Sequence, residues 1–353
     1  MLDVFLFTVT THIMSKEFIG GKEGNPEKKK PLSRDRSVEA ASAAAKSKVH
    51  SLIGNEAKES SQWRYERIET SEDPYTEAAH DLLMSPFKDS EKDPLEVTTH
   101  AIDHEGYVVV AAKGKSGEVG AAISAAANPL RLAGKEEMGD LAFANVCYLV
   151  SETNELRDLV ALYKKMVEEV KYEAGKEGKQ VIGTLTEASG EDLKEEAQEE
   201  KLYNRIGAKR VYVKTGVNSY EEVPYFQPPT TFDDQGKGIS EKEDGTTEEF
   251  GRYSAPEHLM FAPLGENTQS VPKEQMLGMV RGMWQYNSRD NFTGSPEGKK
   301  TMHALIDGYE EEIGRQIMKG DDQNVYLLSE RERRALEKQG AKFINHEKHP
   351  EKK

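Results

Sequence analysis

Few residues of this sequence combine a reactive side chain with a spacing that would support catalysis or phosphate binding. Cys147 could be a nucleophile, but it lies inside the apolar run VCYLV, which is more typical of a small buried side chain. Residues Gly114-Lys115-Ser116 have the ending of a phosphate-binding P-loop, yet that motif requires a glycine where the chain has Val109. We therefore interpret them as a hairpin turn.

Composition excludes several classes of function. The chain has 353 residues and one cysteine, which rules out an internal disulfide and a Cys-rich zinc site, and we expect no bound metal. Its 48 Lys and Arg against 63 Asp and Glu give a formal net charge of -15. An acidic surface repels phosphate backbones, so nucleic-acid binding is disfavoured, although a local basic pocket could still hold one anionic cofactor.

The beginning of the chain does not have the pattern of a targeting segment or a membrane span. Its first seven residues are apolar apart from Asp3, and a span needs roughly 18 apolar residues. We therefore expect no membrane association and a cytoplasmic location. Translation could also begin at Met14, where a polar stretch starts.

Periodic apolar positions predict the elements that must position the candidate residues. The expected strands cover residues 63–68, 107–112, 118–125, 141–150, 181–186, 210–213, 258–262 and 325–328. The expected helices cover residues 74–87, 93–102, 156–174, 191–206, 273–286 and 299–318. This order predicts a mixed α/β fold with a largely antiparallel sheet and one parallel strand–helix–strand crossover.

Composition also divides the chain into five parts. Residues 15–60 and 331–353 are polar and poor in large apolar side chains. We therefore expect a disordered N-terminal tail at 1–60 and a polar C-terminal tail at 331–353. We expect a folded core at 61–229 and an acidic, flexible insertion at 230–257. A C-terminal strand and helices at 258–330 should pack on the core.

The element order from Trp63 to Pro228 resembles the GNAT superfamily of N-acetyltransferases. Residues 145–150 (NVCYLV) are similar to the family's central strand, and residues 156–178 to the long helix that follows it. Residues 202–211 (LYNRIGAKRV) resemble the family's tyrosine-containing helix end and the strand after it. The resemblance implies a GNAT-like, mostly antiparallel twisted sheet flanked by helices, here with a C-terminal helical extension.

The resemblance also implies a site for acetyl-CoA or a related acyl-CoA. In this family the central strand pairs with the pantetheine arm, and the next helix presents its N-terminal amides to the pyrophosphate. The matching residues are Tyr148, Leu149, Val150, Asn154, Arg157, Asp158 and Leu159. The loop departs from the family's R-x-x-G-x-G/A pattern, because Arg157 and Leu159 fill both glycine positions. Either Arg157 supplies the positive charge that the loop amides would provide, or the loop has lost cofactor binding.

Two catalytic roles follow from the same resemblance. Tyr203 stands where the family commonly has a tyrosine that protonates the departing CoA thiolate, and Glu187 would be the base or would bind the amine. Each residue also has a structural interpretation. Tyr203 could pack the last helical turn on the sheet, and Glu187 could cap a helix or face solvent.

We therefore expect an acyl-CoA-dependent N-acyltransferase, in the simplest case an N-acetyltransferase, that transfers the acyl group directly to an amine in a ternary complex. The alternative is a non-catalytic GNAT-like interaction module. It would meet a protein partner through the N-terminal tail, the acidic insertion or the Met-rich helix at 273–286. The loop at 154–159 favours the module, whereas Tyr203 and the central strand favour the enzyme.

Overall fold

The computed structural model describes most of the chain between residues 63 and 344, together with a short N-terminal strand. The described residues are 5–7, 63–85, 95–104, 106–132, 137–152, 156–188, 202–226, 228–229, 232–241, 246–249, 256–265, 269–289 and 294–344. All of them belong to one compact unit, which comprises residues 1–16 and 63–353.

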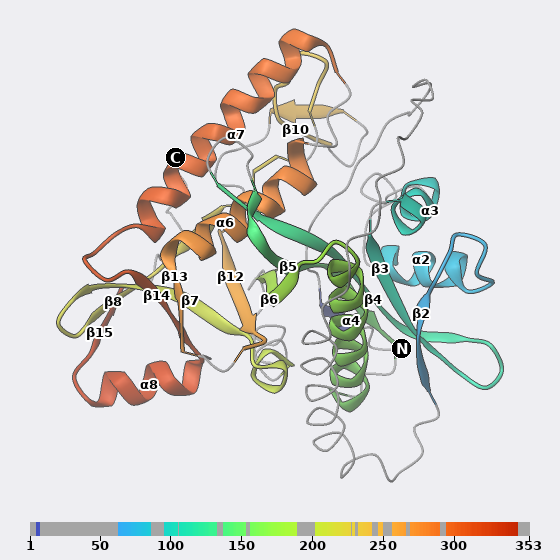
Figure 1. The fold of residues 1–353 in the computed structure, drawn as a ribbon, viewed down its shortest axis with the longest axis horizontal. Helices are drawn as coiled ribbons and strands as arrows, with labels where there is room; N and C mark the ends of the chain where they lie inside the picture. Colours follow the sequence, from blue (N-terminus) through green and yellow to red (C-terminus); the bar gives the residue numbers. More distant parts are fainter. Residues whose placement is uncertain are drawn as a thin grey trace, which may run out of the picture. The chain divides into compact units, whose positions relative to one another are not determined.

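Thirteen of the described strands form one mixed sheet (Figure 1). Its neighbouring strands are, in spatial order, β13 (Ser270–Pro272), β14 (Asn324–Leu328), β7 (Lys209–Gly216), β12 (Pro256–Pro263), β6 (Gln180–Ala188), β5 (Glu137–Ser151), β4 (Val119–Arg131), β3 (Tyr107–Lys113) and β2 (Arg64–Ile68). All of these neighbours are antiparallel except β5 and β6, which are parallel.

Shorter strands pair with parts of these strands. They are β1 (Phe5–Phe7) on β5, β8 (Ser219–Glu222) on β7, β9 (Pro224–Phe226) on β12, and β15 (Lys342–Ile344) on β8. A separate hairpin consists of β10 (Ile239–Glu241) and β11 (Thr247–Glu249).

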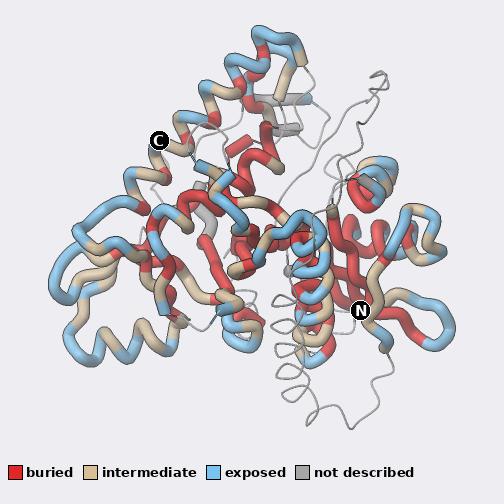
Figure 2. Tube along the Cα trace, in the orientation of Figure 1, coloured by how far each residue is buried: buried red, intermediate tan, exposed pale blue. Residues whose placement is uncertain are grey.

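Helices cover both faces of the sheet at β3, β4 and the second part of β5, and this is why these strands are buried in continuous runs without alternation (Figure 2). On one face, α2 (Thr76–Met84) and α3 (Leu95–His104) pack against a cluster that includes Val109 and Ala111. On the other face, α4 (Leu156–Lys176) packs against a cluster that includes Val108 and Val110. Alternate residues of one strand thus belong to two different cores.

The helix α6 (Lys273–Trp284) lies on the same face as α2 and α3, directly against β4. A Cβ at Gly282 would stand 2.3 Å from the carbonyl oxygen of Pro129, so this close approach requires glycine. A π-helical turn, η2 (Gln285–Arg289), continues α6, and α7 (Pro296–Ile317) packs over it. Together they bury the stripe that the sequence indicates as a core face, namely Met276, Met279, Val280, Met283 and Trp284.

The predicted order of elements is confirmed, and the fold is mixed α/β with a mostly antiparallel sheet and a C-terminal helical region. Of the helix expected at 191–206, residues 202–206 lie in the described part and are helical. Strands β4 and β5 are longer than expected, because they pair with each other as far as Arg131 and Glu137.

The prediction of a polar tail from residue 331 is wrong for residues 331–344. Helix α8 (Glu330–Lys338) starts at a capping box in which the Ser329 side chain and Glu332 bond each other's backbone amides. It buries no side chain, and this explains why its sequence has the composition of a tail. After it, β15 pairs with β8, and Phe343 stacks on Tyr220 with ring centroids 5.2 Å apart.

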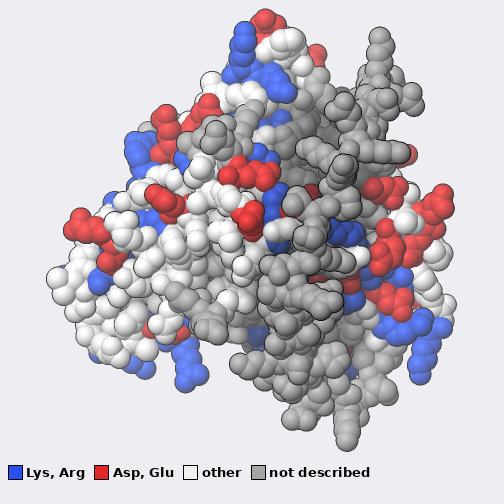
Figure 3. All heavy atoms as spheres, in the orientation of Figure 1, with Lys and Arg blue, Asp and Glu red and all other residues white. Residues whose placement is uncertain are grey.

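The predicted boundary at residues 60–61 falls outside the described residues, whereas the predicted insertion at 230–257 is described at residues 232–241, 246–249 and 256–257. The predicted N-terminal tail contributes β1, and the predicted insertion contributes the β10–β11 hairpin. Side chains of both charges are interspersed on the face drawn in Figure 3. No helix in the described residues is long and apolar enough to cross a bilayer.

Candidate functional site

The parallel strands β5 and β6 pair over only the first part of their common length. Their register runs from Leu141 opposite Gln180 to Asn145 opposite Leu185. Beyond that point β6 keeps its other neighbour, β12, as far as Ala188, while β5 continues beside β4 as far as Ser151. The two strands therefore separate inside the sheet, and the edge of β5 that faces β6 becomes available to another partner.

A β-bulge lies directly after this separation. The register between β4 and β5 passes from Ala125 opposite Val146 to Ser124 opposite Tyr148, so Cys147 is an extra residue in β5. Such a bulge bends its strand, which turns the end of β5 away from β6. Cys147 itself is fully buried, in agreement with its interpretation as a small core residue.

The edge of β5 that faces the separation is paired with an extended segment of the same chain. Strand β1 pairs antiparallel with it, placing Phe7 opposite Leu149, Leu6 opposite Val150 and Phe5 opposite Ser151. The side chains of the three predicted pantetheine-binding residues, Tyr148, Leu149 and Val150, are buried in the two cores. Any ligand at this position would therefore meet their backbone groups.

The predicted pyrophosphate loop leads into the first turn of α4. Asn154 lies outside the described residues. The side chain of Arg157 is 58% exposed, with its Nε 3.6 Å from Oδ1 of Asp158. Asp158 is only 2% exposed and accepts a hydrogen bond of 2.7 Å from the hydroxyl of Tyr65. Leu159 is part of the core under α4, so Arg157 is the loop residue in the described part that reaches solvent.

Glu187 lies on β6 just beyond the separation point and is only 2% exposed. The hydroxyl of Tyr225, on β9, donates a hydrogen bond to its Oε1. The indole Nε1–H of Trp284, on α6, donates in turn to the oxygen of Tyr225 at 2.8 Å. Glu187 therefore faces α6, and it is a buried, hydrogen-bonded carboxylate rather than one that faces solvent.

Tyr203 lies on the opposite face of the sheet. It is 8% exposed and packs against Ala188 on β6 and Met260 on β12. In the register of these two strands, Ala188 lies opposite His258 and Met260 lies opposite Thr186. Thr184, two residues before Thr186 on the same face, bonds the hydroxyl of Tyr163 on α4 at 2.6 Å. Tyr203 thus shares the α4 face, while Glu187 lies on the α6 face. The two predicted catalytic residues flank the separation from opposite sides.

Sequence reasoning missed a histidine–carboxylate pair beside Tyr203. His258 Nδ1 lies 2.7 Å from Oε1 of Glu222, and Arg210 Nη1 lies 3.7 Å from the same oxygen. Burial acts to raise the pKa of Glu222, but His258 and Arg210 outweigh it and hold this pKa below its ordinary value. Strand pairing brings these residues together from 36 positions apart, so no local motif could reveal them.

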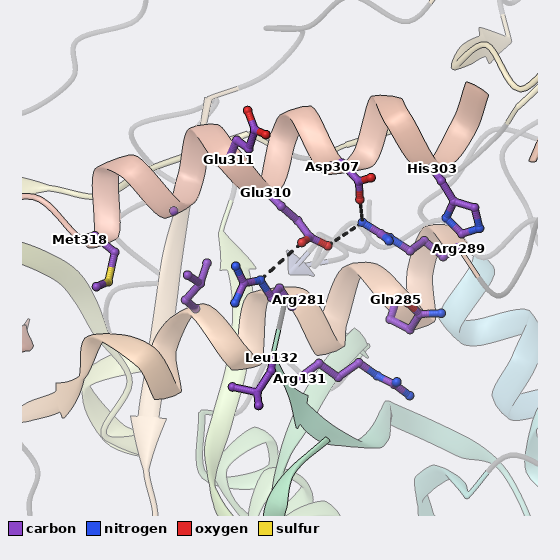
Figure 4. Close-up of a pocket in the computed structure, with 12 residues that line it drawn as sticks. Arg131, Leu132, Arg281, Gln285, Arg289, His303, Asp307, Glu310, Glu311 and Met318 are labelled. Carbon is purple, nitrogen blue, oxygen red and sulfur yellow. Dashed lines mark hydrogen bonds and ion pairs between the residues drawn. The ribbon is translucent and has the colours of Figure 1, made fainter. Parts of the chain in front are cut away.

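A pocket of about 640 Å³ lies between α6 and α7 (Figure 4). Arg289 donates to Asp307 at 2.6 Å and to Glu310 at 2.7 Å, and Arg281 lies 3.4 Å from Glu310. Burial raises the pKa of Glu310 despite these arginines. Because opposite charges pair across the pocket, we interpret it as an ion-paired contact between the two helices.

The described residues contain no group of three or more side chains that could hold a metal ion. His100 and His104 stand four residues apart on α3, a spacing used by metal ligands. Residues Gly114 to Gly117 form the turn between β3 and β4, as expected.

No family model matches the chain, and no curated protein matches its sequence. Among solved structures, the chain is similar to an acetyltransferase of the GNAT family from Staphylococcus aureus Mu50, with 11% identity and a TM-score of 0.31 over 57% of this chain and 100% of that one. Arabidopsis thaliana NAA60 in complex with a bisubstrate analogue gives 12% identity and a TM-score of 0.33 over 57% and 98%. An aminoglycoside 6'-N-acetyltransferase complexed with coenzyme A gives 15% and 0.31 over 58% and 98%. The chain thus resembles GNAT acetyltransferases over slightly more than half of its length.

The pair of Glu222 and His258 predicts a specific dependence of stability on pH. Because the folded protein holds the pKa of Glu222 below the ordinary value of 4.5, ionised Glu222 stabilises the fold above that pH and loses this effect on acidification. Glu222→Gln should lower the free energy of unfolding at pH 7, and its difference from wild type should shrink below about pH 4.5. Urea titrations from pH 3 to 7 measure this.

The matched control is Glu137→Gln, which removes a more exposed partner of Lys179 and should change the stability little at any pH. A difference between Glu222→Gln and wild type that stays constant across the whole range would contradict the assignment.

Proposed function

We propose that this protein is an acyl-CoA-dependent N-acyltransferase, in the simplest case an N-acetyltransferase, that acts on an amine. The observation that carries the proposal is the separation of β5 and β6 after Asn145 and Leu185. The separation leaves backbone groups of β5 that can bind a ligand. The carboxylate of Glu187 lies on one face of the sheet at this point, and the phenol of Tyr203 lies on the other. Direct acyl transfer needs this combination, since one group must take a proton from the amine while another gives a proton to sulfur.

Acyl-CoA would lie along β5 with its pyrophosphate at the start of α4. The pairing of β1 with Leu149, Val150 and Ser151 supports this, because the edge already binds an extended chain through backbone groups. The amides of the first turn of α4 and the exposed Arg157 offer positive potential to the pyrophosphate. Binding would therefore displace β1 from the edge.

The residues of the chain would then share the proton transfers. Bound acyl-CoA supplies an activated thioester. The amine nitrogen forms a bond to the acyl carbon as the carbon–sulfur bond breaks, and Glu187 takes the proton that the amine loses. Tyr203 gives its proton to the leaving sulfur. In this arrangement the amine approaches from the α6 face and the sulfur lies toward the α4 face.

A non-catalytic interaction module is the second candidate, and the position of β1 favours it. A strand that occupies the edge of β5 resembles the mode in which sheet edges bind extended peptides. The burial of Asp158 and Leu159, where the family's loop has glycine-rich backbone, agrees with this function as well. Here the edge would bind a strand of a protein partner.

Binding of acetyl-CoA separates the two candidates. Isothermal titration should give a measurable affinity for the full chain and a higher affinity for a variant that lacks residues 1–13, because β1 no longer competes. Arg157→Ala should weaken binding roughly 10- to 100-fold, the scale of a hydrogen bond to a charged group, and should reduce its sensitivity to salt.

Arg334→Ala is the matched control, because Arg334 is also well exposed and ion-paired but lies on α8, which packs by β14, three strands from β6 on the side away from β5. It should leave the affinity unchanged. If neither the full chain nor the shortened variant binds acetyl-CoA, the acyltransferase proposal fails and the interaction module stands.

Turnover of Tyr203→Phe tests the predicted acid. This change keeps the ring and removes the proton donor, so acyl transfer to an amine should fall about 10²-fold while the free energy of unfolding stays nearly constant. Release of free CoA thiol measures the rate. Tyr163→Phe removes a buried hydroxyl on the same face, bonded to Thr184, and should lower stability but keep turnover.

Unchanged turnover in Tyr203→Phe would remove the catalytic role. A loss of stability as large as that of Tyr163→Phe would assign Tyr203 to packing.

A further inference from the structure

A continuous buried chain of hydrogen bonds connects the C-terminal helices to the end of β6. It runs from the indole of Trp284 on α6 through the hydroxyl of Tyr225 on β9 to the carboxylate of Glu187. All three side chains are at least 98% buried. Polar groups buried to this extent among leucine and phenylalanine side chains are costly unless each is paired, so a chain of this kind needs a reason.

The direction of the chain follows from the chemistry of its members. An indole N–H can only donate, so the oxygen of Tyr225 accepts from Trp284. The hydroxyl of Tyr225 has one proton, and that proton points to Oε1 of Glu187. Because a donated hydrogen bond favours the charged form of a carboxylate, the chain stabilises ionised Glu187 against the effect of burial.

Packing keeps Trp284 and Tyr225 in place. Their ring centroids are 6.1 Å apart, and Trp284 also contacts Tyr309 on α7 edge-to-face at 6.4 Å. Other titratable groups on the surrounding elements already have partners. His258 on β12 is bonded to Glu222 on the opposite sheet face, and Arg281 on α6 is paired with Glu310. The donor to Oε1 of Glu187, Tyr225, thus packs on Trp284 of α6, which in turn packs on Tyr309 of α7.

We propose that Tyr225 and Trp284 are positioning residues, which keep Glu187 ionised and oriented as the proton acceptor for the amine. Through them, α6 and α7 become part of the active site although they lie outside the segment that resembles GNAT enzymes. The role of Glu187 in this inference rests on the proposed acyltransferase function, whereas the hydrogen-bond chain can be tested without it.

The chain of hydrogen bonds can be observed directly, because the protein has only two tryptophans, Trp63 and Trp284. A ¹H–¹⁵N spectrum of the full-length protein should show two indole signals, which Trp63→Phe assigns. The Trp284 signal should shift with pH as Glu187 titrates, since protonation of Glu187 changes the hydrogen bond of Tyr225. This pH-dependent shift should disappear in Glu187→Gln and in Tyr225→Phe. The Trp63 signal should be the same in both variants as in the wild type.

Kinetics then test the positioning role. Tyr225→Phe should reduce kcat at pH 7 roughly 10- to 100-fold, the scale of losing a hydrogen bond to a charged group, and should move the acidic limb of the pH–rate profile to higher pH. The affinity for acetyl-CoA should not change. Trp284→Phe should move the acidic limb of the pH–rate profile in the same direction, but by less than Tyr225→Phe does. Tyr163→Phe controls for loss of a buried hydroxyl and should keep the wild-type limb.

The outcomes distinguish the two levels of the proposal. A Trp284 signal whose titration persists in Glu187→Gln overturns the hydrogen-bond chain, even in a protein with full activity. A profile of Tyr225→Phe that coincides with wild type overturns the positioning role. If the full chain binds no acetyl-CoA, the proposed function fails and the positioning role fails with it, whereas the indole titration still decides whether the chain of hydrogen bonds exists.

Discussion

The rest of the structure depends on one constraint, which is that the backbone groups of β5 lose their partner β6 after Asn145. Buried N–H and C=O groups must be paired, so a strand edge that opens in the interior of a sheet needs a substitute partner. On the other side of the opening, β6 stays in the sheet through β12, which pairs with its opposite edge from Gly183 to Ala188. The edge of β5 from Leu149 to Ser151 takes β1. It is the one position described in this sheet where a short segment from far away in the chain completes the pairing of a long central strand.

The surrounding elements give this opening two chemically different sides. Helix α4 follows β5 directly and covers one face, where Tyr203 packs beside Ala188. Helix α6 covers the other face, and it comes close to β4 because Gly282 has no side chain. Alternation along β6 then decides which side chain faces which helix, so that Thr184 bonds α4 and Glu187 bonds toward α6 through Tyr225. Strand alternation therefore places Glu187 on the face opposite Thr184, and the helical residues 202–206 bring Tyr203 to the face of Thr184.

The sequence could predict the order of the elements because their periodicity is local. The stripe of Leu159, Tyr163 and Val170 indicates a helix whatever its neighbours are, and the structure forms α4 there. It could not predict α8, whose side chains are all outside the core and whose position depends on a cap at Ser329 and on strand pairing after it. For the same reason residues 331–344 are folded although their composition is typical of a tail.

The candidate site shows the same division between local and distant information. Glu187 and Tyr203 could be selected through the resemblance to GNAT enzymes, but the roles of their partners could not be predicted. Asp158 was expected at a phosphate, and its hydrogen bond is to Tyr65, 93 positions away. Tyr225 and Trp284 stand 59 positions apart and meet only because β9 and α6 approach the same face of the sheet. Contacts of this kind carry no periodic or motif signal.

Amide hydrogen exchange of the full-length protein, with and without saturating acetyl-CoA, tests most directly whether the free edge of β5 is the cofactor site. The account predicts slower exchange at residues 146–151 and in the first turn of α4, together with faster exchange at residues 5–7 as β1 leaves the edge. Unchanged exchange at β5 in the presence of acetyl-CoA, or protection confined to the pocket between α6 and α7, would contradict it.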